Sequence, residues 1–189
     1  MKNILDVGCG RRKLEGAIGI DSADLPEVDI KHDLNIYPWP IKGDYFSEIH
    51  INHVIEHLDS TIKLMEEVYR ICENGARVFI RVPHASCSMV SWQDPTHKRP
   101  YTCTSFYYFS KEYGYSYYHN VNFKIKKVRL NYCLYDGAKK ERNRIPKWFQ
   151  NIWNTLANFN YTSQLIFERF LAGYIGGFEE LYVELEVIK

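Results

Sequence analysis

The first twenty-one residues constrain the fold of this chain more than any other segment. Two short apolar runs, residues 4–7 and 17–21, flank the glycine turn Gly8-Cys9-Gly10, and the second run ends in Asp21. A strand, a glycine turn and a second strand place bare backbone N–H groups at the carboxyl edge of a parallel sheet, where open α/β folds bind nucleotide-like ligands. The chain is therefore predicted to begin at a cofactor site.

The spacing within this segment separates it from dinucleotide-binding folds. Such folds carry a third glycine in the turn and an acid about 20 residues downstream. Here Lys13 stands at the third glycine position, and Asp21 follows Gly8 after only thirteen residues. A nicotinamide cofactor is therefore disfavoured. Residues 11–16 can form at most about a turn and a half of helix at 3.6 residues per turn, so the first crossover helix is expected to be shortened or absent.

Four motifs in order along residues 1–85 resemble those of class I S-adenosylmethionine-dependent methyltransferases. Residues 5–10 resemble the first motif, and residues 18–21 resemble the second, whose acid holds the ribose in that family. Asp33 with Leu34 resembles the pair that holds the adenine. Residues 52–58 resemble the stretch beside the methionyl part of the cofactor. The helix-to-strand turn at residues 70–78 fits the same pattern.

The resemblance implies S-adenosyl-L-methionine as the cofactor and S-adenosyl-L-homocysteine as its product. The residues that it assigns to cofactor binding are Asp6, Gly8, Cys9, Gly10, Asp21, Ser22, Asp33, Leu34, Asn52 and His53. No metal is expected. His53 and His57 have the spacing of zinc ligands on one helix face, with Glu56 between them. However, they fall at a strand end entering a turn, and the metalloprotease order with Glu directly after the first His is absent.

The segment after Pro83 is expected to face the acceptor. Residues 92–101 mix aromatic, polar and proline residues, which is typical of a shaped loop over a site rather than a linker. The Asp-Pro-Thr-His run at residues 94–97 resembles a compact subgroup of methyltransferases found near glycan and cell-surface biosynthesis genes. Asp94 and His97 are the first candidates for a general base, and His84 is the third. An equally weighted alternative is that these side chains only tie the loop together by hydrogen bonds.

Apolar periodicity predicts a continuing α/β alternation. A helix is expected over residues 61–72 with Asp59 or Ser60 as its N-cap. Another is expected to begin at Ser105. Further strands are predicted at residues 29–34, 48–51, 77–82, 122–135 and 181–189, and a helix at 148–159. The predicted fold is a Rossmann-like, seven-stranded, mostly parallel sheet with an antiparallel last strand and a helical insertion near residues 146–175. Residues 1–189 are interpreted as a single domain, with a cofactor-binding half at 1–85 and an acceptor-side half at 86–189.

Composition favours an ordinary globular chain. Hydrophobic residues make up 46% of the sequence and charged residues 25%, which is close to average usage. The five cysteines are odd in number and form no C-x-x-C pair, so neither a disulfide framework nor a zinc knuckle is indicated. Neither a membrane span nor a signal peptide is evident, and a cytoplasmic location is expected.

Charge is unevenly distributed along the chain. Residues 1–75 carry 8 Lys and Arg against 14 Asp and Glu, whereas residues 124–147 carry 9 against 2. The basic and aromatic stretch at 139–159 admits three interpretations: packing over the pocket or the sheet, a homodimer contact, or peripheral contact with an anionic membrane. Nucleic acid is disfavoured as a partner, because the net charge is only +1 and no RNA-binding module is evident.

Taken with the resemblance, these features predict methyl transfer to an oxygen or nitrogen of a small-molecule or glycan-type acceptor. A non-catalytic cofactor-binding or assembly protein with the same fold is the first alternative. An RNA methyltransferase is the second.

Overall fold

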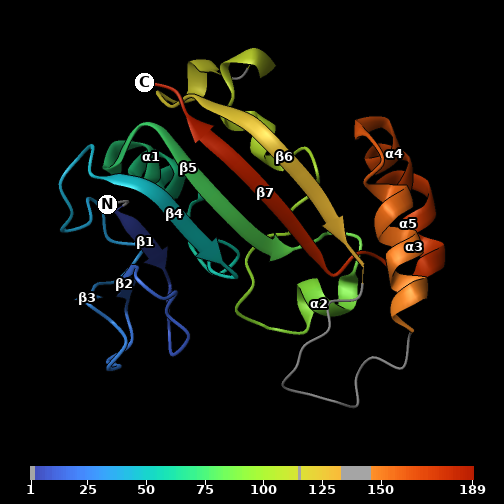
Figure 1. The fold of residues 1–189 in the computed structure, drawn as a ribbon, viewed down its shortest axis with the longest axis horizontal. Coiled ribbons are helices and arrows are strands. Elements are labelled where there is room, and N and C mark those ends of the chain that lie inside the picture. The colour runs from blue at the N-terminus through green and yellow to red at the C-terminus, as the bar shows by residue number, and fades with distance from the viewer. Residues whose placement is uncertain (1–2, 115, 133–145) are drawn as a thin grey trace.

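The fold is built on one seven-stranded sheet (Figure 1). The computed structural model describes residues 3–114, 116–132 and 146–189. The strands are β1 (Ile4–Val7), β2 (Ile18–Asp21), β3 (Ile30–Lys31), β4 (Phe46–Asn52), β5 (Cys72–Pro83), β6 (Phe123–Asn131) and β7 (Glu180–Val187). Their order across the sheet is β3-β2-β1-β4-β5-β7-β6. The first five strands are parallel, and β7 runs antiparallel to both β5 and β6. The predicted Rossmann-like α/β sheet is confirmed.

The connection between β1 and β2 contains no helix, as the short spacing predicts. The glycine turn leads into a loop that returns directly to β2, and Leu5, Asp6 and Val7 pair in register with Ile18, Gly19 and Ile20. The turn therefore has no crossover helix behind it, and its Gly8 and Gly10 N–H groups donate to the Ile20 carbonyl and the Asp21 carboxylate. Little macrodipole contributes at this turn, and binding there depends on individual amides and side chains.

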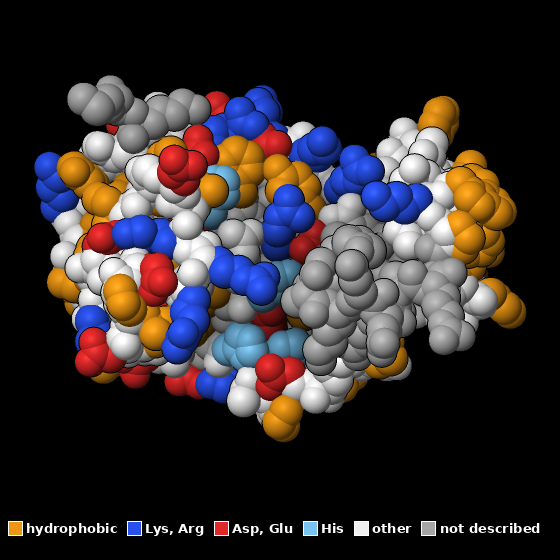
Figure 2. All heavy atoms as spheres, turned by 60° about the horizontal axis from the view of Figure 1, so that its bottom comes forward, with side chains coloured by type: hydrophobic (Ala, Val, Ile, Leu, Met, Phe, Trp, Pro, Cys, Tyr) orange, Lys and Arg blue, Asp and Glu red, His pale blue; other side chains and the backbone are white. Residues whose placement is uncertain are grey.

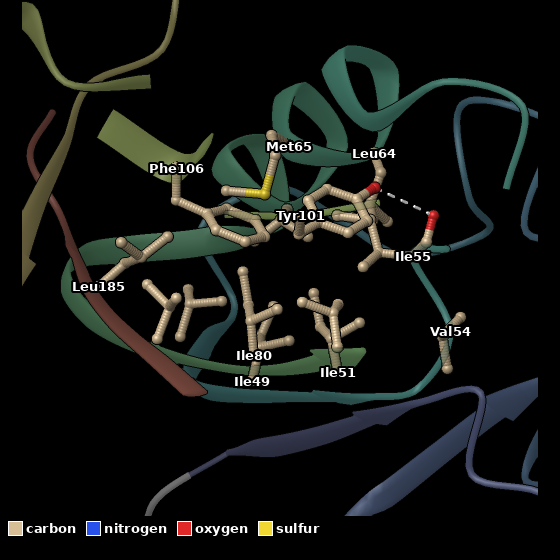
Figure 3. Packing of buried hydrophobic residues seen from close by; sticks show 14 of the residues in the cluster. Ile49, Ile51, Val54, Ile55, Leu64, Met65, Ile80, Tyr101, Phe106 and Leu185 are labelled. Carbon is tan, nitrogen blue, oxygen red and sulfur yellow. Dashed lines mark hydrogen bonds between the residues drawn. The ribbon is translucent and has the colours of Figure 1, made fainter. Parts of the chain in front are cut away.

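Helix α1 (Thr61–Ile71) forms as the periodicity predicts and begins at the expected cap. The Ser60 side chain accepts a hydrogen bond from the Lys63 N–H. Leu64, Met65 and Val68 lie on its buried face. Together with Tyr101 and Phe106, Leu64 and Met65 cover one face of the sheet, above Ile49, Ile51 and Ile80 (Figure 3). This core fixes the loops at the carboxyl edges of β4 and β5.

A helical insertion lies beside β6 at one end of the sheet (Figure 1). It comprises α3 (Lys147–Ala157), α4 (Tyr161–Ile166), a π-helical segment (Phe167–Leu171) and α5 (Ala172–Ile175), which confirms the insertion predicted near residues 146–175. Asn158 ties it to the sheet, because its side chain both donates to the Leu130 carbonyl and accepts from the Leu130 N–H.

Several predicted boundaries were wrong for local reasons. The strand predicted at 29–34 is only β3, because the Asp33 side chain accepts from the Asn35 N–H and starts a turn. Strand β5 begins earlier than predicted, directly after α1. The segment at Ser105–Phe109 is a 3-10 helix, followed by 3-10 turns at Lys111–Tyr113 and Ser116–Tyr118. The short helix α2 (Ser88–Trp92) was not predicted. The end of the strand predicted at 122–135, like the basic run at 139–144, lies outside the described residues.

Among the described residues, no helix is both long and apolar enough to cross a membrane.

Candidate active site

A cavity of about 330 Å³ lies at the carboxyl edge of the sheet. Figure 2 looks onto this edge, where histidine side chains lie with acidic ones along a central hollow. The cavity is lined by residues of the turn after β1 and of the loops after β2, β3 and β4: Gly8, Asp21, Ser22, Asp33, Leu34, Asn35, His53, Val54, His57 and Leu58. Six of the ten residues predicted to bind the cofactor therefore line one cavity.

The floor of the cavity at Gly8 has no room for a side chain. Gly8 has a φ of +66°, and a Cβ there would lie 2.3 Å from Cγ2 of Val54. Gly19 is restricted on the other side of the turn, because a Cβ on it would lie 2.6 Å from Sγ of Cys9. Both positions therefore require glycine, because the turn packs closely against neighbouring side chains of the protein.

The two acids on the cavity wall are held by backbone amides. Asp21 accepts from the Gly10 N–H through one carboxylate oxygen and from the Ala23 N–H through the other, both at 2.9 Å. Asp33 accepts from the Asn35 N–H at 2.9 Å through Oδ1. A carboxylate oxygen has more than one acceptor site, so both groups retain capacity for ligand hydroxyl or amine donors.

Four of the predicted cofactor residues do not line the cavity: Asp6, Cys9, Gly10 and Asn52. Asp6 is buried and accepts from the Leu14 N–H at 2.8 Å, so it holds the returning loop. Burial raises the pKa of the Asp6 carboxyl. Burial likewise raises the pKa of the Cys9 thiol, which packs against Gly19. Gly10 acts through its amide, which positions Asp21.

His53 lies between two buried carboxylates. Its Nε2 is 3.2 Å from Oε2 of Glu180, and its Nδ1 is 3.4 Å from Oε1 of Glu56. Burial opposes the charged form, but the hydrogen bond that His53 donates to Glu180 and the nearby Glu56 carboxylate outweigh it and raise the pKa of His53 to about 9. A protonated imidazole at the cavity wall suits a ligand carboxylate.

Residues 94–101 are fastened onto the segment that follows β4. The Lys98 N–H donates to the Glu56 carbonyl at 2.7 Å, and the Arg99 guanidinium donates to the carbonyls of Leu58 and Asp59. The Tyr101 hydroxyl lies 2.7 Å from the Thr61 hydroxyl. This docking brings His97 against His57, with ring centroids 4.7 Å apart.

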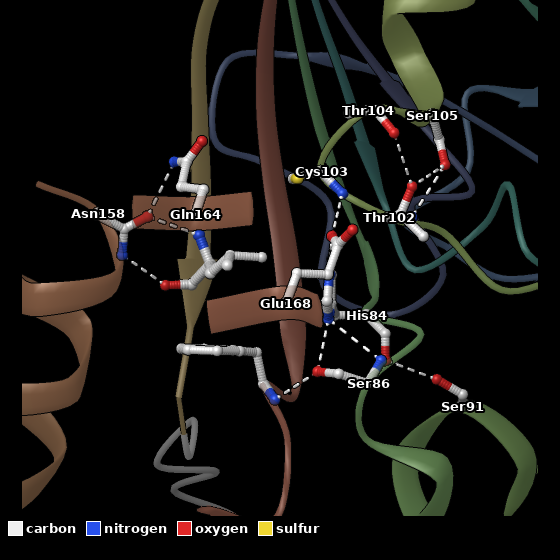
Figure 4. Close-up of polar contacts among 12 residues, drawn as sticks. His84, Ser86, Ser91, Thr102, Cys103, Thr104, Ser105, Asn158, Gln164 and Glu168 are labelled. Atoms are coloured by element: carbon white, nitrogen blue, oxygen red, sulfur yellow. Dashed lines mark hydrogen bonds and ion pairs between the residues drawn. The ribbon is translucent and has the colours of Figure 1, made fainter. Parts of the chain in front are cut away.

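The three candidate bases have different surroundings. Asp94 is in this loop, and hydrogen bonds from the Thr96 hydroxyl and N–H lower the pKa of its carboxyl. His97 is partly exposed, and its Nδ1 lies 2.8 Å from the Ser91 carbonyl. His84 is fully buried, with Nδ1 at 2.8 Å from the Ser86 hydroxyl and Nε2 at 2.8 Å from Glu168 (Figure 4). Because both ring nitrogens of His84 are occupied beneath the surface, the structure favours an anchoring task for it.

A family model for a methyltransferase domain matches residues 1–128, which is more than half of the chain. The chain belongs to this family. The matched region contains the cavity and the whole loop that carries Asp94 and His97. No curated protein matches the methyltransferase significantly.

Solved structures share the fold of this methyltransferase over nearly its whole length. A SAM-dependent methyltransferase from Archaeoglobus fulgidus has a TM-score of 0.61 at 20% identity, covering 98% of this chain and 86% of its own. A putative methyltransferase from Bacillus halodurans has a TM-score of 0.59 at 11% identity, covering 100% and 93%. A chain from the complex of the Haloferax volcanii Trm112 methyltransferase activator with a putative methyltransferase has a TM-score of 0.57 at 9% identity, covering 100% and 83%. At these identities the likeness shows the fold alone.

Four residues that line the cavity were not among the ten assigned to cofactor binding from sequence: Asn35, Val54, His57 and Leu58. Val54 and Leu58 look like ordinary core residues in the sequence, because their apolar side chains carry no mark of a ligand. His57 belongs to the stretch that the resemblance places beside the cofactor, but the sequence favours His53 over it for direct contact. Its place four residues after His53, on a loop that turns over the cavity, was the signal available.

Proposed function

We propose that this methyltransferase binds S-adenosylmethionine in the cavity lined by Gly8, Asp21 and Asp33 and transfers its methyl group to an oxygen or nitrogen of a small-molecule or glycan-type acceptor. The observation that carries the proposal is the convergence of these three residues on one cavity in a member of the methyltransferase family. S-adenosylmethionine as the cofactor is supported by the family, by neighbours named SAM-dependent methyltransferases, and by the sequence motifs.

The chemistry of the cavity fits each part of this cofactor. Asp21 would accept hydrogen bonds from the ribose hydroxyls. Backbone amides hold both of its carboxylate oxygens in place, and each oxygen can accept a further hydrogen bond. Asp33 would accept from the adenine amine, and Leu34 would pack on the ring. The bare backbone at Gly8 and the cationic His53 would receive the methionyl end. Asp6, Cys9, Gly10 and Asn52 would support these contacts from outside the cavity.

The transfer needs little from the protein beyond placement. A lone pair on the acceptor atom forms a bond to the methyl carbon as the carbon–sulfur bond breaks, and that electron pair stays on sulfur. The sulfonium becomes a neutral thioether, and the acceptor loses one proton. Alignment of the reacting atoms about 3 Å apart supplies several kcal/mol of the barrier reduction.

A proton acceptor is needed where the acceptor atom is a hydroxyl oxygen. Of the three candidates, His97 has the most suitable surroundings, because it is partly exposed and adjoins His57 on the cavity wall. The Ser91 carbonyl can only accept, so Nδ1 of His97 carries the hydrogen and Nε2 of the neutral ring carries the lone pair. Asp94 remains a second candidate. The role of His97 in the site also depends on its two neighbours, because His97 forms a cluster with Glu56 and His57.

Binding and turnover test this function separately. We expect S-adenosylhomocysteine to bind by calorimetry, and labelled methyl groups from S-adenosylmethionine to pass to members of a panel of hydroxylated small molecules, oligosaccharides and RNA. Binding with no transfer to any acceptor would favour the non-catalytic alternative. Transfer to RNA alone would favour an RNA methyltransferase. Failure to bind either form of the cofactor would contradict the proposal.

The helical insertion presents an exposed apolar surface on which a homodimer contact or a membrane contact is proposed. Its exposed side chains include Trp148, Phe159, Phe170 and Tyr174, whereas Phe149 and Trp153 pack inward. Packing against the rest of the protein therefore accounts for only part of the aromatic stretch. Of the proposals made from sequence, a homodimer contact and peripheral membrane contact through residues 139–159 both stay open. Co-sedimentation with anionic vesicles at low salt, beside light scattering of the free protein, distinguishes them. A cytoplasmic location remains a prediction.

A further inference from the structure

Three side chains next to the cofactor cavity, Glu56, His57 and His97, form a cluster of metal-ligating groups. One ligand atom from each of Glu56, His57 and His97 lies within 4.8 Å of the other two. Glu56 and His57 come from the segment after β4, and His97 comes from the loop docked onto it. His57 also lines the cavity, so the cluster adjoins the place where the acceptor would meet the cofactor.

The Glu56 carboxylate lacks the hydrogen bonds that a buried charge needs. The residue is 1% exposed, and neither carboxylate oxygen has a hydrogen-bond partner among the described residues. Its nearest cation, Nδ1 of His53, lies 3.4 Å away without hydrogen-bond geometry. The neighbouring buried carboxylate of Glu180 differs, because it accepts from Arg81 at 2.8 Å and from Asn131 at 2.7 Å. A buried and unsatisfied carboxylate costs stability, and such groups in native proteins commonly coordinate a cation.

The hydrogen bonds of both histidines leave the same nitrogen available. Nδ1 of His97 faces the Ser91 carbonyl and must donate to it. The Thr96 hydroxyl donates to the Asp94 carboxylate at 2.6 Å, so it accepts from Nδ1 of His57 at 2.7 Å. In the neutral rings Nε2 therefore carries the lone pair, and none of the hydrogen bonds among the described residues uses it. In known metal sites the imidazole ligands are oriented in the same way, by hydrogen bonds from the other ring nitrogen to a carbonyl or to a group held by a carboxylate.

We infer that Glu56, His57 and His97 bind a divalent transition-metal ion beside the cofactor cavity. Two imidazoles and one carboxylate form a ligand set used for zinc and for ferrous iron, and imidazole disfavours magnesium and calcium. Ligands with bonds of about 2.1 Å on one tetrahedral ion lie about 3.4 Å apart. The side chains would therefore close by no more than about 1.5 Å, which rotation of the two partly exposed rings permits.

Three protein ligands leave coordination positions open for other atoms. Provided that the proposed methyl transfer holds, an oxygen of the acceptor would occupy one of them, and the acceptor class would be hydroxylated molecules. The ion would lower the pKa of a hydroxyl that it binds, as it does for water. His97 would then act as a ligand rather than as the base.

The test measures metal binding directly, with Co²⁺ as the probe because its visible absorption reports imidazole coordination. Protein freed of metal by EDTA dialysis is titrated as wild type, Glu56→Gln and His97→Asn. His32→Gln serves as the matched control, since this histidine is partly exposed and contacts the Ile36 carbonyl outside the cluster. If Glu56→Gln fails to fold, His57→Asn replaces it. Circular dichroism and S-adenosylhomocysteine binding check each variant.

We expect one Co²⁺ per chain for the wild type and His32→Gln, and binding weaker by at least about tenfold in the cluster variants. No binding by the wild type, or equal binding by all the proteins, would overturn the inference. A wild-type protein that binds Co²⁺ but fails to bind S-adenosylhomocysteine would contradict only the methyl-transfer proposal. A wild-type protein that binds S-adenosylhomocysteine but fails to bind Co²⁺ would contradict only the metal site.

Discussion

Nε2 of His84 lies 2.8 Å from Oε2 of Glu168, and this contact joins the loop after β5 to the helical insertion. The same Glu168 oxygen accepts from the Cys103 N–H at 2.7 Å. Figure 4 shows Glu168 between His84 and Cys103, with both contacts drawn. His84 was one of three candidate bases in the sequence, and its contacts instead describe an anchor.

The Glu168 anchor predicts a pH-dependent stability. Burial opposes ionisation, but the hydrogen bonds from His84 and the Cys103 N–H outweigh it, so the pKa of Glu168 lies below its ordinary value of 4.5. A depressed carboxyl pKa stabilises the fold above the ordinary value, and this contribution is lost as the pH falls through the folded value. Glu168→Gln should lower the free energy of unfolding at pH 7 by about 1–3 kcal/mol, and the difference should shrink below about pH 4.5. Urea unfolding at both pH values measures this.

The control for this experiment is Glu66→Gln, which changes an exposed carboxyl on α1. It should unfold as the wild type does at both pH values. A Glu168→Gln protein with the stability of wild type at pH 7 would contradict the anchoring role.

The tight contact at Gly8 predicts a rescue. Gly8→Ala places a Cβ 2.3 Å from Val54 and forces a left-handed conformation, so the affinity for S-adenosylhomocysteine should fall sharply. Gly10→Ala is the matched control, because it also has a positive φ but has no atom within 4 Å of the new Cβ. Adding Val54→Ala to Gly8→Ala should restore part of the affinity, while the backbone strain of about 1–2 kcal/mol remains. Equal loss in the two single variants would show that steric contact with Val54 is unimportant.

Asp33 offers a test of the adenine contact that spares the local turn. In Asp33→Asn the amide oxygen can still accept from the Asn35 N–H, but the charge is lost. Hydrogen bonds to a charged group are worth about 1.5–3 kcal/mol, so calorimetry should show S-adenosylhomocysteine binding weakened about tenfold or more. Asp24→Asn, on an exposed carboxylate paired with Lys31, should leave binding unchanged. Unchanged binding in Asp33→Asn would remove Asp33 from the cofactor site.

Thr96 is predicted to act on the metal through His57. Thr96→Val keeps the side-chain shape but removes the hydroxyl. This hydroxyl accepts a hydrogen bond from Nδ1 of His57 and donates one to the Asp94 carboxylate. Loss of such a supporting contact weakens metal binding by about 10- to 100-fold. Binding of S-adenosylhomocysteine should not change, because Thr96 does not line the cavity. Replacement with Ser should restore Co²⁺ binding, and a Thr96→Val protein with wild-type Co²⁺ affinity would contradict this role.

Much of the cofactor half could be predicted from sequence because its information is local. Strand length, the glycine turn and the short spacing to Asp21 together fix β1, β2 and the missing crossover helix. The N-cap at Ser60 and the apolar period of α1 are equally local. Boundaries failed where a side chain overrides the pattern, as Asp33 does when it ends β3.

The sequence alone determined the family, the order of the elements and the acids offered to the cofactor, since each depends on residues a few positions apart. Only the tertiary structure decided which acid faces the cavity and which, like Asp6, supports the turn from beneath. It also brought His97 to Glu56 and His57, and Glu168 to His84. These contacts form because residues 94–101 and the helical insertion dock onto the rest of the fold. Docking depends on packing and hydrogen bonds between segments that are far apart in the sequence, which local patterns in the sequence do not reveal.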